Sequence, residues 1–321
     1  MGPDSARRPP SAGPGSRARQ KLKTLGGVGR ATVEALTLIE YTDPHSIWRW
    51  GCEPVLRRVE WLYPEVRVRA VMGGLFEDFR PMKEYWTRMS GGNWKSSVHT
   101  FFSGVAGTHR MPTDADRLLD ATDDFVSTYP ACLAAKAAEL QGPREGGRYL
   151  RRLREAFNAE GRGIHRREVQ EAVAVESGID LGAFRAALED GRAERAFQAD
   201  LQATRADKVT GFPTFVVRRL AQAVRIEGYH PWDTFLGALQ EFEPDLEDRT
   251  VPATPEAVVK FLAGHERLAT REVAEVLGVP DDEAEILLDE LEVNGRVARR
   301  PVGSGLFWEV PGRRPLAEAG P

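Results

Sequence analysis

Residues 42–54 read TDPHSIWRWGCEP and join two stretches of different periodicity. Before them, residues 35–41 are rich in apolar, β-branched and aromatic side chains, and the run stops at Asp43-Pro44, which predicts a β-strand. After them, apolar residues recur every three or four positions over residues 48–62, which predicts an amphipathic helix. Residues 66–72 then alternate apolar with basic side chains before two glycines, as a half-buried strand does. This order indicates a βαβ unit with parallel strands.

Length and composition limit the class of protein. The 321 residues exceed the ~250–300 at which one hydrophobic core stops growing, so we expect two domains. The net charge of −4 excludes a global basic field that would recruit nucleic acid or anionic lipid. No run approaches the ~18–20 apolar residues of a membrane span, so no membrane partner is expected. With only two cysteines in the chain, a disulfide framework is excluded, and a cytoplasmic location fits best.

A large helical insertion is predicted after the βαβ unit, from about residue 80 to residue 205. The helices expected within it cover residues 114–129, 130–141, 146–158, 166–177, 181–189 and 193–208. Strand character returns at residues 211–217 and 223–226, and an amphipathic helix follows at residues 232–242. We therefore expect an α/β domain over residues 35–242 and a linker over residues 243–253.

A second, small α+β domain is predicted over residues 254–310. Three short helices (254–263, 270–278 and 281–294) precede two short strands (297–299 and 306–310), and this spacing resembles a winged helix-turn-helix. Its third helix would enter a DNA groove, but residues 281–292 carry seven acids and no Lys or Arg, so phosphates would repel it. We therefore expect a protein-docking module. Residues 1–34, with seven Lys or Arg, and residues 311–321 are predicted to be disordered tails.

The motif of residues 42–54 resembles that of the DsbA-like thioredoxin-fold oxidoreductases, particularly the FrnE branch. That branch typically reads Thr-Asp-Pro-x-Cys-x-Trp-Cys-Trp-Gly-x-Glu-Pro here, and Gly-(Val/Phe)-Pro-Thr-Phe at a second site, which residues 211–215 match. The resemblance implies a thioredoxin-like fold over about residues 36–242. Everything matches except the two cysteines, whose positions are taken by Ser46 and Arg49.

This departure excludes dithiol chemistry at the motif. In the family, the first cysteine lies at a helix N-terminus that stabilises its thiolate, and the second resolves the mixed disulfide one turn later. A serine hydroxyl is too weak an acid to replace the thiolate of the first cysteine, and an arginine side chain cannot resolve a mixed disulfide as the second cysteine does. Any surviving enzyme would belong to the oxidoreductase family by descent only.

Ser46 and Arg49 remain the leading site candidates, each with two interpretations. Ser46 suits the N-cap of the first helix. By resemblance to kappa-type glutathione transferases and 2-hydroxychromene-2-carboxylate isomerases, it would instead hold the thiolate of a bound glutathione. Arg49 would pair with a carboxylate or phosphate of the ligand, or point into solvent.

The remaining candidates surround these two positions. By resemblance, Phe212 and a cis Pro213, with Thr214, would present backbone groups to a peptide or thiol ligand. His45 and Trp48 flank Ser46 and are candidate ligand contacts, although packing is the simpler reading for Trp48. If a redox thiol survives, Cys52 is the candidate, although a buried, inert thiol is the simpler reading. The other histidines show no metal-ligand spacing, so no metal site is predicted.

Two functions follow from these observations. The first is a thiol- or peptide-binding protein that performs glutathione-dependent isomerisation or transfer beside Ser46. The alternative is a non-catalytic adapter: SpxH-type proteins are also DsbA-like, and they present a protein substrate to a protease without thiol exchange.

Overall fold

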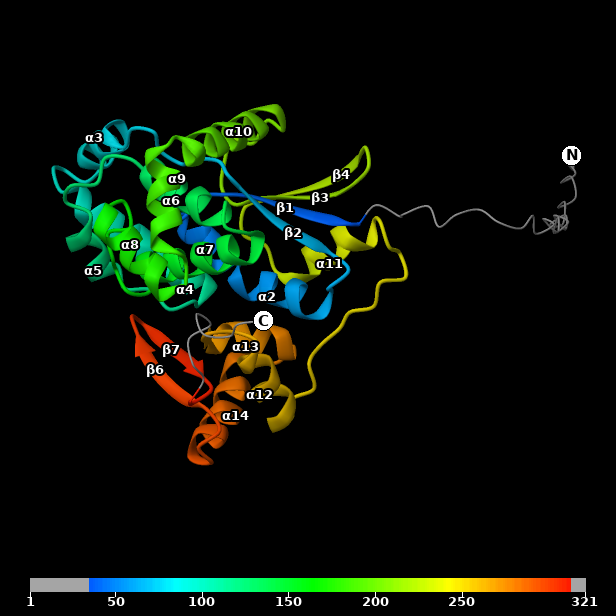
Figure 1. The fold of residues 1–321 in the computed structure, drawn as a ribbon. Helices are drawn as coiled ribbons and strands as arrows, with labels where there is room; N and C mark the ends of the chain where they lie inside the picture. The colour runs from blue at the N-terminus through cyan, green and yellow to red at the C-terminus, as the bar shows by residue number, and fades with distance from the viewer. Residues whose placement is uncertain (1–34, 313–321) are drawn as a thin grey trace, which may run out of the picture. The chain divides into compact units, whose positions relative to one another are not determined.

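The computed structural model describes residues 35–312, and within them a four-stranded sheet carries the motif (Figure 1). The sheet has the strand order β2-β1-β3-β4. β1 (Thr37–Thr42) runs parallel to β2 (Arg67–Met72) and antiparallel to β3 (Thr214–Arg219), which pairs with β4 (Gln222–Glu227). The predicted βαβ unit is therefore present, and the sheet is that of a thioredoxin-like fold with both β2 and β4 as edges.

Helices cover both faces of this sheet (Figure 1). On one face, α2 (Glu53–Leu62) and α11 (Trp232–Gln240) pack on β1 and β3 through Leu56, Phe215 and Phe235. On the other, Ile39 of β1 and Val216 of β3 pack with Ala203, in the last of the helices of the insertion. These helices are α3 (Arg80–Met89), α4 (Trp94–His109), α5 (Ala115–Ala121), α6 (Tyr129–Glu139), α7 (Pro143–Asn158), α8 (Arg167–Glu176), α9 (Leu181–Glu189) and α10 (Arg192–Ala206).

Two of the predicted helices differ from the structure. The single helix expected over residues 48–62 is two helices, α1 (Ile47–Gly51) and α2, because Cys52 ends the first and caps the second. The helix expected over residues 114–129 ends at Ala121, where Thr122-Asp123-Asp124, three poor helix formers, begin. Helices α3 and α4 were expected only as part of a helical region, without bounds.

The C-terminal segment has its helices and hairpin at the expected places. The elements are α12 (Pro255–Ala263), β5 (Leu268–Ala269), α13 (Thr270–Leu277), α14 (Asp281–Val293), β6 (Ala298–Val302) and β7 (Gly305–Glu309). β5, which the sequence did not predict, completes a sheet of order β5-β7-β6 over a separate apolar cluster that contains Phe261 and Trp308. That this segment is a winged-helix domain, and that residues 243–253 are a linker between domains, stay predictions. The predicted tails, residues 1–34 and nearly all of 311–321, lie outside the described residues.

Candidate functional site

Ser46 is the N-cap of α1. Its Oγ accepts a hydrogen bond from the backbone N–H of Arg49 at 3.3 Å and donates to the carbonyl oxygen of Phe212 at 3.5 Å. The residue is 5% exposed. Serine at this position satisfies a backbone N–H that the first helical turn leaves without a partner. The hydroxyl is thus held between two parts of its own chain.

Arg49 points into the protein, not toward solvent. Its Nε lies 2.6 Å from Oε1 of Glu40, its Nη2 donates to Oε2 of the same carboxylate at 2.7 Å, and its Nη1 lies 3.1 Å from Oε1 of Glu53. Only 2% of its side chain is exposed. The position of the family's second cysteine therefore holds a buried cation between two carboxylates, one on β1 and one on α2.

Further arginines surround the same two carboxylates. Arg154 of α7 contacts Glu40, lies 3.3 Å from Glu53, and donates to Oγ1 of Thr42 at 2.9 Å. Burial disfavours the ionised form of both glutamates, but the neighbouring arginines outweigh it and hold the pKa of each below its ordinary value. Both carboxylates are therefore charged at neutral pH.

This buried ion cluster extends to the C-terminal segment. Arg57 of α2 lies 3.2 Å from Glu53 and 3.3 Å from Glu272 of α13. Arg151 of α7 contacts the same two glutamates at 3.6 and 2.9 Å. Glu272 is fully buried and also accepts from the backbone N–H of Ala269, so it caps α13. A continuous chain of charged contacts thus joins the motif helix to α13.

His45 and Trp48 lie in packed surroundings. The backbone N–H of His45 donates to Oδ1 of Asp43 at 2.8 Å, and its buried ring packs against Phe125 and Phe157 at centroid distances of 5.1 and 4.7 Å. The half-buried ring of Trp48 lies 6.0 Å from that of Tyr229. His45 is therefore buried and Trp48 half-buried beside Ser46, and a ligand-binding role for the two side chains stays a prediction.

The second motif closes over Ser46. The peptide bond between Phe212 and Pro213 is cis, and the ring of Phe212 fills the space above Gly73, where a Cβ would collide with it. Thr214 is buried, and its hydroxyl donates to the carbonyl of Gly211 at 2.8 Å. Phe212, Pro213 and Thr214 are thus brought next to Ser46, as the motif resemblance implies. Their binding of a peptide or thiol stays a prediction.

Neither cysteine is placed for thiol chemistry. Cys52 is fully buried, and burial, with the charges of Glu40 and Glu53, raises its pKa to about 12. Cys132 of α6 is equally buried and donates to Oδ2 of Asp43 at 3.4 Å; burial and that carboxylate raise its pKa well above its ordinary value. Because the thiolate is the nucleophile, both thiols are held in their unreactive form at neutral pH.

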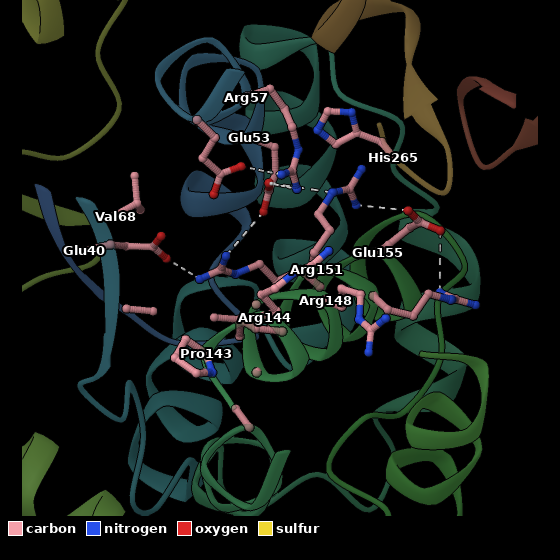
Figure 2. Close-up of a pocket in the computed structure, with 18 of the residues that line it drawn as sticks. Glu40, Glu53, Arg57, Val68, Pro143, Arg144, Arg148, Arg151, Glu155 and His265 are labelled. Atoms are coloured by element: carbon pink, nitrogen blue, oxygen red, sulfur yellow. Dashed lines mark hydrogen bonds and ion pairs between the residues drawn. The ribbon is translucent and has the colours of Figure 1, made fainter. Parts of the chain in front are cut away.

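A cavity of about 490 Å³ opens beside the ion cluster, between β2, α7 and the loop before β5 (Figure 2). Nine arginines and six glutamates line it, and no Phe, Tyr or Trp does. The sequence analysis did not predict this cavity, because its walls come from segments far apart in the chain. The one signal was the spacing of the arginines on α7, at residues 144, 148, 151, 152 and 154.

Two further features of residues 35–312 bear on function. Within these residues, no group of three or more histidine, cysteine, aspartate or glutamate side chains is placed to hold a metal ion. Within the same residues, no helix has the length and hydropathy needed to cross a membrane.

Comparison with known proteins places the chain in a family. The sequence profile of the family described as thioredoxin matches residues 40–236, more than half of the chain. The chain therefore belongs to the thioredoxin family and has the DsbA-like form of its fold.

Individual proteins similar to this chain carry more specific names than the family does. The ClpXP adapter protein SpxH of Shouchella clausii (strain KSM-K16) is 32% identical over 278 residues, which are 85% of this chain and 88% of that protein. The protein of the same name from Halalkalibacterium halodurans is 28% identical over 280 residues, again 85% and 88% of the two chains. Among solved structures, the cytosolic disulfide reductase DsbM from Pseudomonas aeruginosa matches with a TM-score of 0.51 and 23% identity, covering 64% of this chain and 100% of that one. At this identity the match to DsbM shows the fold alone.

Proposed function

We propose that this protein is an adapter that presents a protein substrate to the ClpXP protease and works without thiol exchange. The observation that carries the proposal is the likeness to proteins named ClpXP adapter over 85% of the chain. That likeness covers about 280 residues, more than the thioredoxin match at residues 40–236, so it includes sequence outside that match.

The state of the motif supports an adapter over an enzyme. Ser46 is engaged as a helix cap, and Arg49 is paired with two buried carboxylates. Both positions that carry the family's redox chemistry thus serve the fold. Glutathione binding beside Ser46, and the isomerase or transferase activity that would follow, have less support because the Ser46 hydroxyl already has two partners.

The C-terminal segment is the second part of the proposal. On its helix α14, the carboxylates of Asp282, Glu283, Glu285 and Glu290 form no ion pair within residues 35–312, so they repel nucleic acid phosphates and suit contact with another protein. We therefore propose that this winged-helix-like segment is a protein-docking module and does not bind DNA.

Protein lifetimes in cells test the proposal. The gene is deleted in the source organism, and protein half-lives are measured by pulse labelling and quantitative proteomics beside a strain without ClpX. We expect a small set of proteins to be stabilised in both strains and to regain their short half-lives when the wild-type gene is returned. No stabilised protein, or a set unaffected by loss of ClpX, would contradict the adapter function. Saturable binding of reduced glutathione in calorimetry, lost in Ser46→Ala, would favour the enzyme instead.

A further inference from the structure

The outer edge of β2 carries backbone groups without partners. The N–H of Arg67 donates to the carbonyl of Leu36, and that of Gly73 to the carbonyl of Thr42, so the backbone N–H and C=O groups of the odd-numbered residues point toward β1. In a parallel pair the backbone groups of the intervening residues point away from the partner strand. The N–H of Met72 does so, because it donates to Oδ2 of Asp200 at 2.9 Å.

Val68 and Ala70 are the two remaining residues of that outward edge. Both line the cavity, and β2 is a terminal strand of its sheet. Within residues 35–312, no hydrogen bond is made to the outward N–H or carbonyl of either residue. A free strand edge is a template for pairing with another extended segment.

The rim of the cavity next to this edge is cationic. Arg144 in the first turn of α7 is exposed and has no ion pair within the described part of the chain. Arg69 of β2 is also exposed, but its side chain points to the other face of the strand from Val68 and Ala70. Arg148, one turn further along α7, lies 3.6 Å from Glu145, and its Nε has no hydrogen-bond partner. Figure 2 shows Arg144, Arg148 and Arg151 on the same side of the cavity, opposite Val68. The arginines deeper in the cavity are held by the glutamates of the ion cluster.

We propose that this cavity binds an extended, acidic peptide segment of another protein, which pairs with the edge of β2 and places its carboxylates against Arg144 and Arg148. Charge complementarity selects the occupant. Nine lining arginines outnumber six glutamates, and Arg144 and Arg148 have a single carboxylate partner between them among the described residues. A volume of about 490 Å³ falls within the range of ligand-binding sites and exceeds what a single inorganic anion needs.

Other occupants fit less well. The 34 residues before the described part of this chain hold seven Lys or Arg and two acids, so arginines would repel them. Single-stranded nucleic acid would meet phosphate-binding arginines, but the cavity is lined by no Phe, Tyr or Trp on which successive bases could stack. The proposal does not rest on the adapter function, since a peptide site can serve any protein partner.

Binding of a defined peptide tests the proposal. The probe is a fluorescein-labelled octapeptide that alternates valine with glutamate, titrated with the full-length protein in a fluorescence anisotropy assay. We expect saturable binding that weakens as salt is raised, and at least tenfold weaker binding of the matched peptide that alternates valine with glutamine.

Variants of the protein and the peptide locate the site. The double variant Arg144→Glu/Arg148→Glu, on the side of the cavity opposite strand β2, is expected to bind the acidic probe at least tenfold more weakly. The control, Arg67→Glu, lies on β2 but does not line the cavity, and is expected to bind within threefold of wild type. N-methylation of all valines or of all glutamates blocks one edge of the peptide at a time, and we expect at least one methylated form to lose tenfold in affinity.

Three results would overturn the proposal. The first is the absence of saturable binding, and the second is binding that Arg144→Glu/Arg148→Glu leaves unchanged while the thermal melt of this variant matches wild type. The third is displacement of the acidic peptide by an RNA octamer that binds more tightly, which would assign the cavity to nucleic acid. If neither methylated peptide loses affinity, pairing with β2 is refuted and charge alone holds the probe.

Discussion

Replacing Arg49 by methionine tests whether the position of the second family cysteine is structural. Arg49→Met removes three close contacts to Glu40 and Glu53 and leaves both carboxylates buried with fewer cations. Removing one partner of a buried ion pair costs about 3–5 kcal/mol, because the remaining charge keeps its desolvation cost. For a cooperative unit of about 150–250 residues, each kcal/mol lowers the melting temperature by about 2–4 °C. We therefore expect a decrease of at least about 6 °C.

Calorimetry or circular dichroism at pH 7 measures this shift, with two further variants beside it. Arg49→Lys keeps the charge but loses the forked geometry, so its melting temperature is expected between those of wild type and Arg49→Met. Arg67→Met removes an exposed arginine without an ion pair from β2, and is expected to stay within about 0.5 kcal/mol of wild type. If Arg49→Met melts within 2 °C of wild type, the guanidinium is not held in the ion cluster, and a ligand contact becomes the better account of Arg49.

Three further predictions concern the thiols, acid stability and nucleic acid. Cys52 and Cys132 are both buried with raised pKa values, so Ellman's reagent is expected to label neither in the native protein and both in urea; rapid native labelling would refute this. Glu40 and Glu53 have lower pKa values when folded, so the stability they contribute is present above the ordinary glutamate value of about 4.3 and is lost as the pH falls. Melting temperatures between pH 6 and pH 3 are therefore expected to fall less steeply in Glu53→Gln, and equal slopes would contradict the assignment. The full-length protein is expected not to bind a 20-base-pair DNA duplex at low salt, because α14 carries acidic side chains where a DNA-recognition helix carries lysine and arginine. Tight, salt-sensitive binding of the duplex would refute the prediction that the C-terminal segment docks to protein.

The sequence predicts the local elements that periodicity specifies. The strands of the βαβ unit, helix 181–189 and the hairpin near the C-terminus follow from alternating or three-to-four-residue spacing, and each lies within a few residues of its predicted place. The break at Cys52 was not predicted, because both short helices keep their apolar residues on a continuous periodic pattern. β5 has two residues and forms only by pairing with β7, so it has no local signature.

The site is less accessible to sequence reasoning than the fold. The motif identified Ser46 and Arg49 as the replaced positions, but an isolated arginine gives no sign of whether it faces solvent or the interior. The carboxylates that hold it, Glu40 and Glu53, lie nine and four positions away and are opposed to it only after β1 and α2 pack together. The cavity depends in the same way on contacts between distant segments.

The most direct test of the central claim is the half-life of the stabilised proteins in a deletion strain that expresses a cysteine-free chain. Cys52→Ala/Cys132→Ala removes every thiol, and both side chains are buried, so an adapter that works without thiol exchange keeps its function. The account predicts that this variant, expressed at the wild-type level, restores the short half-lives as fully as the wild-type chain does. Failure to restore them, with the variant folded and present at the wild-type level, would show that a thiol takes part and would contradict the account.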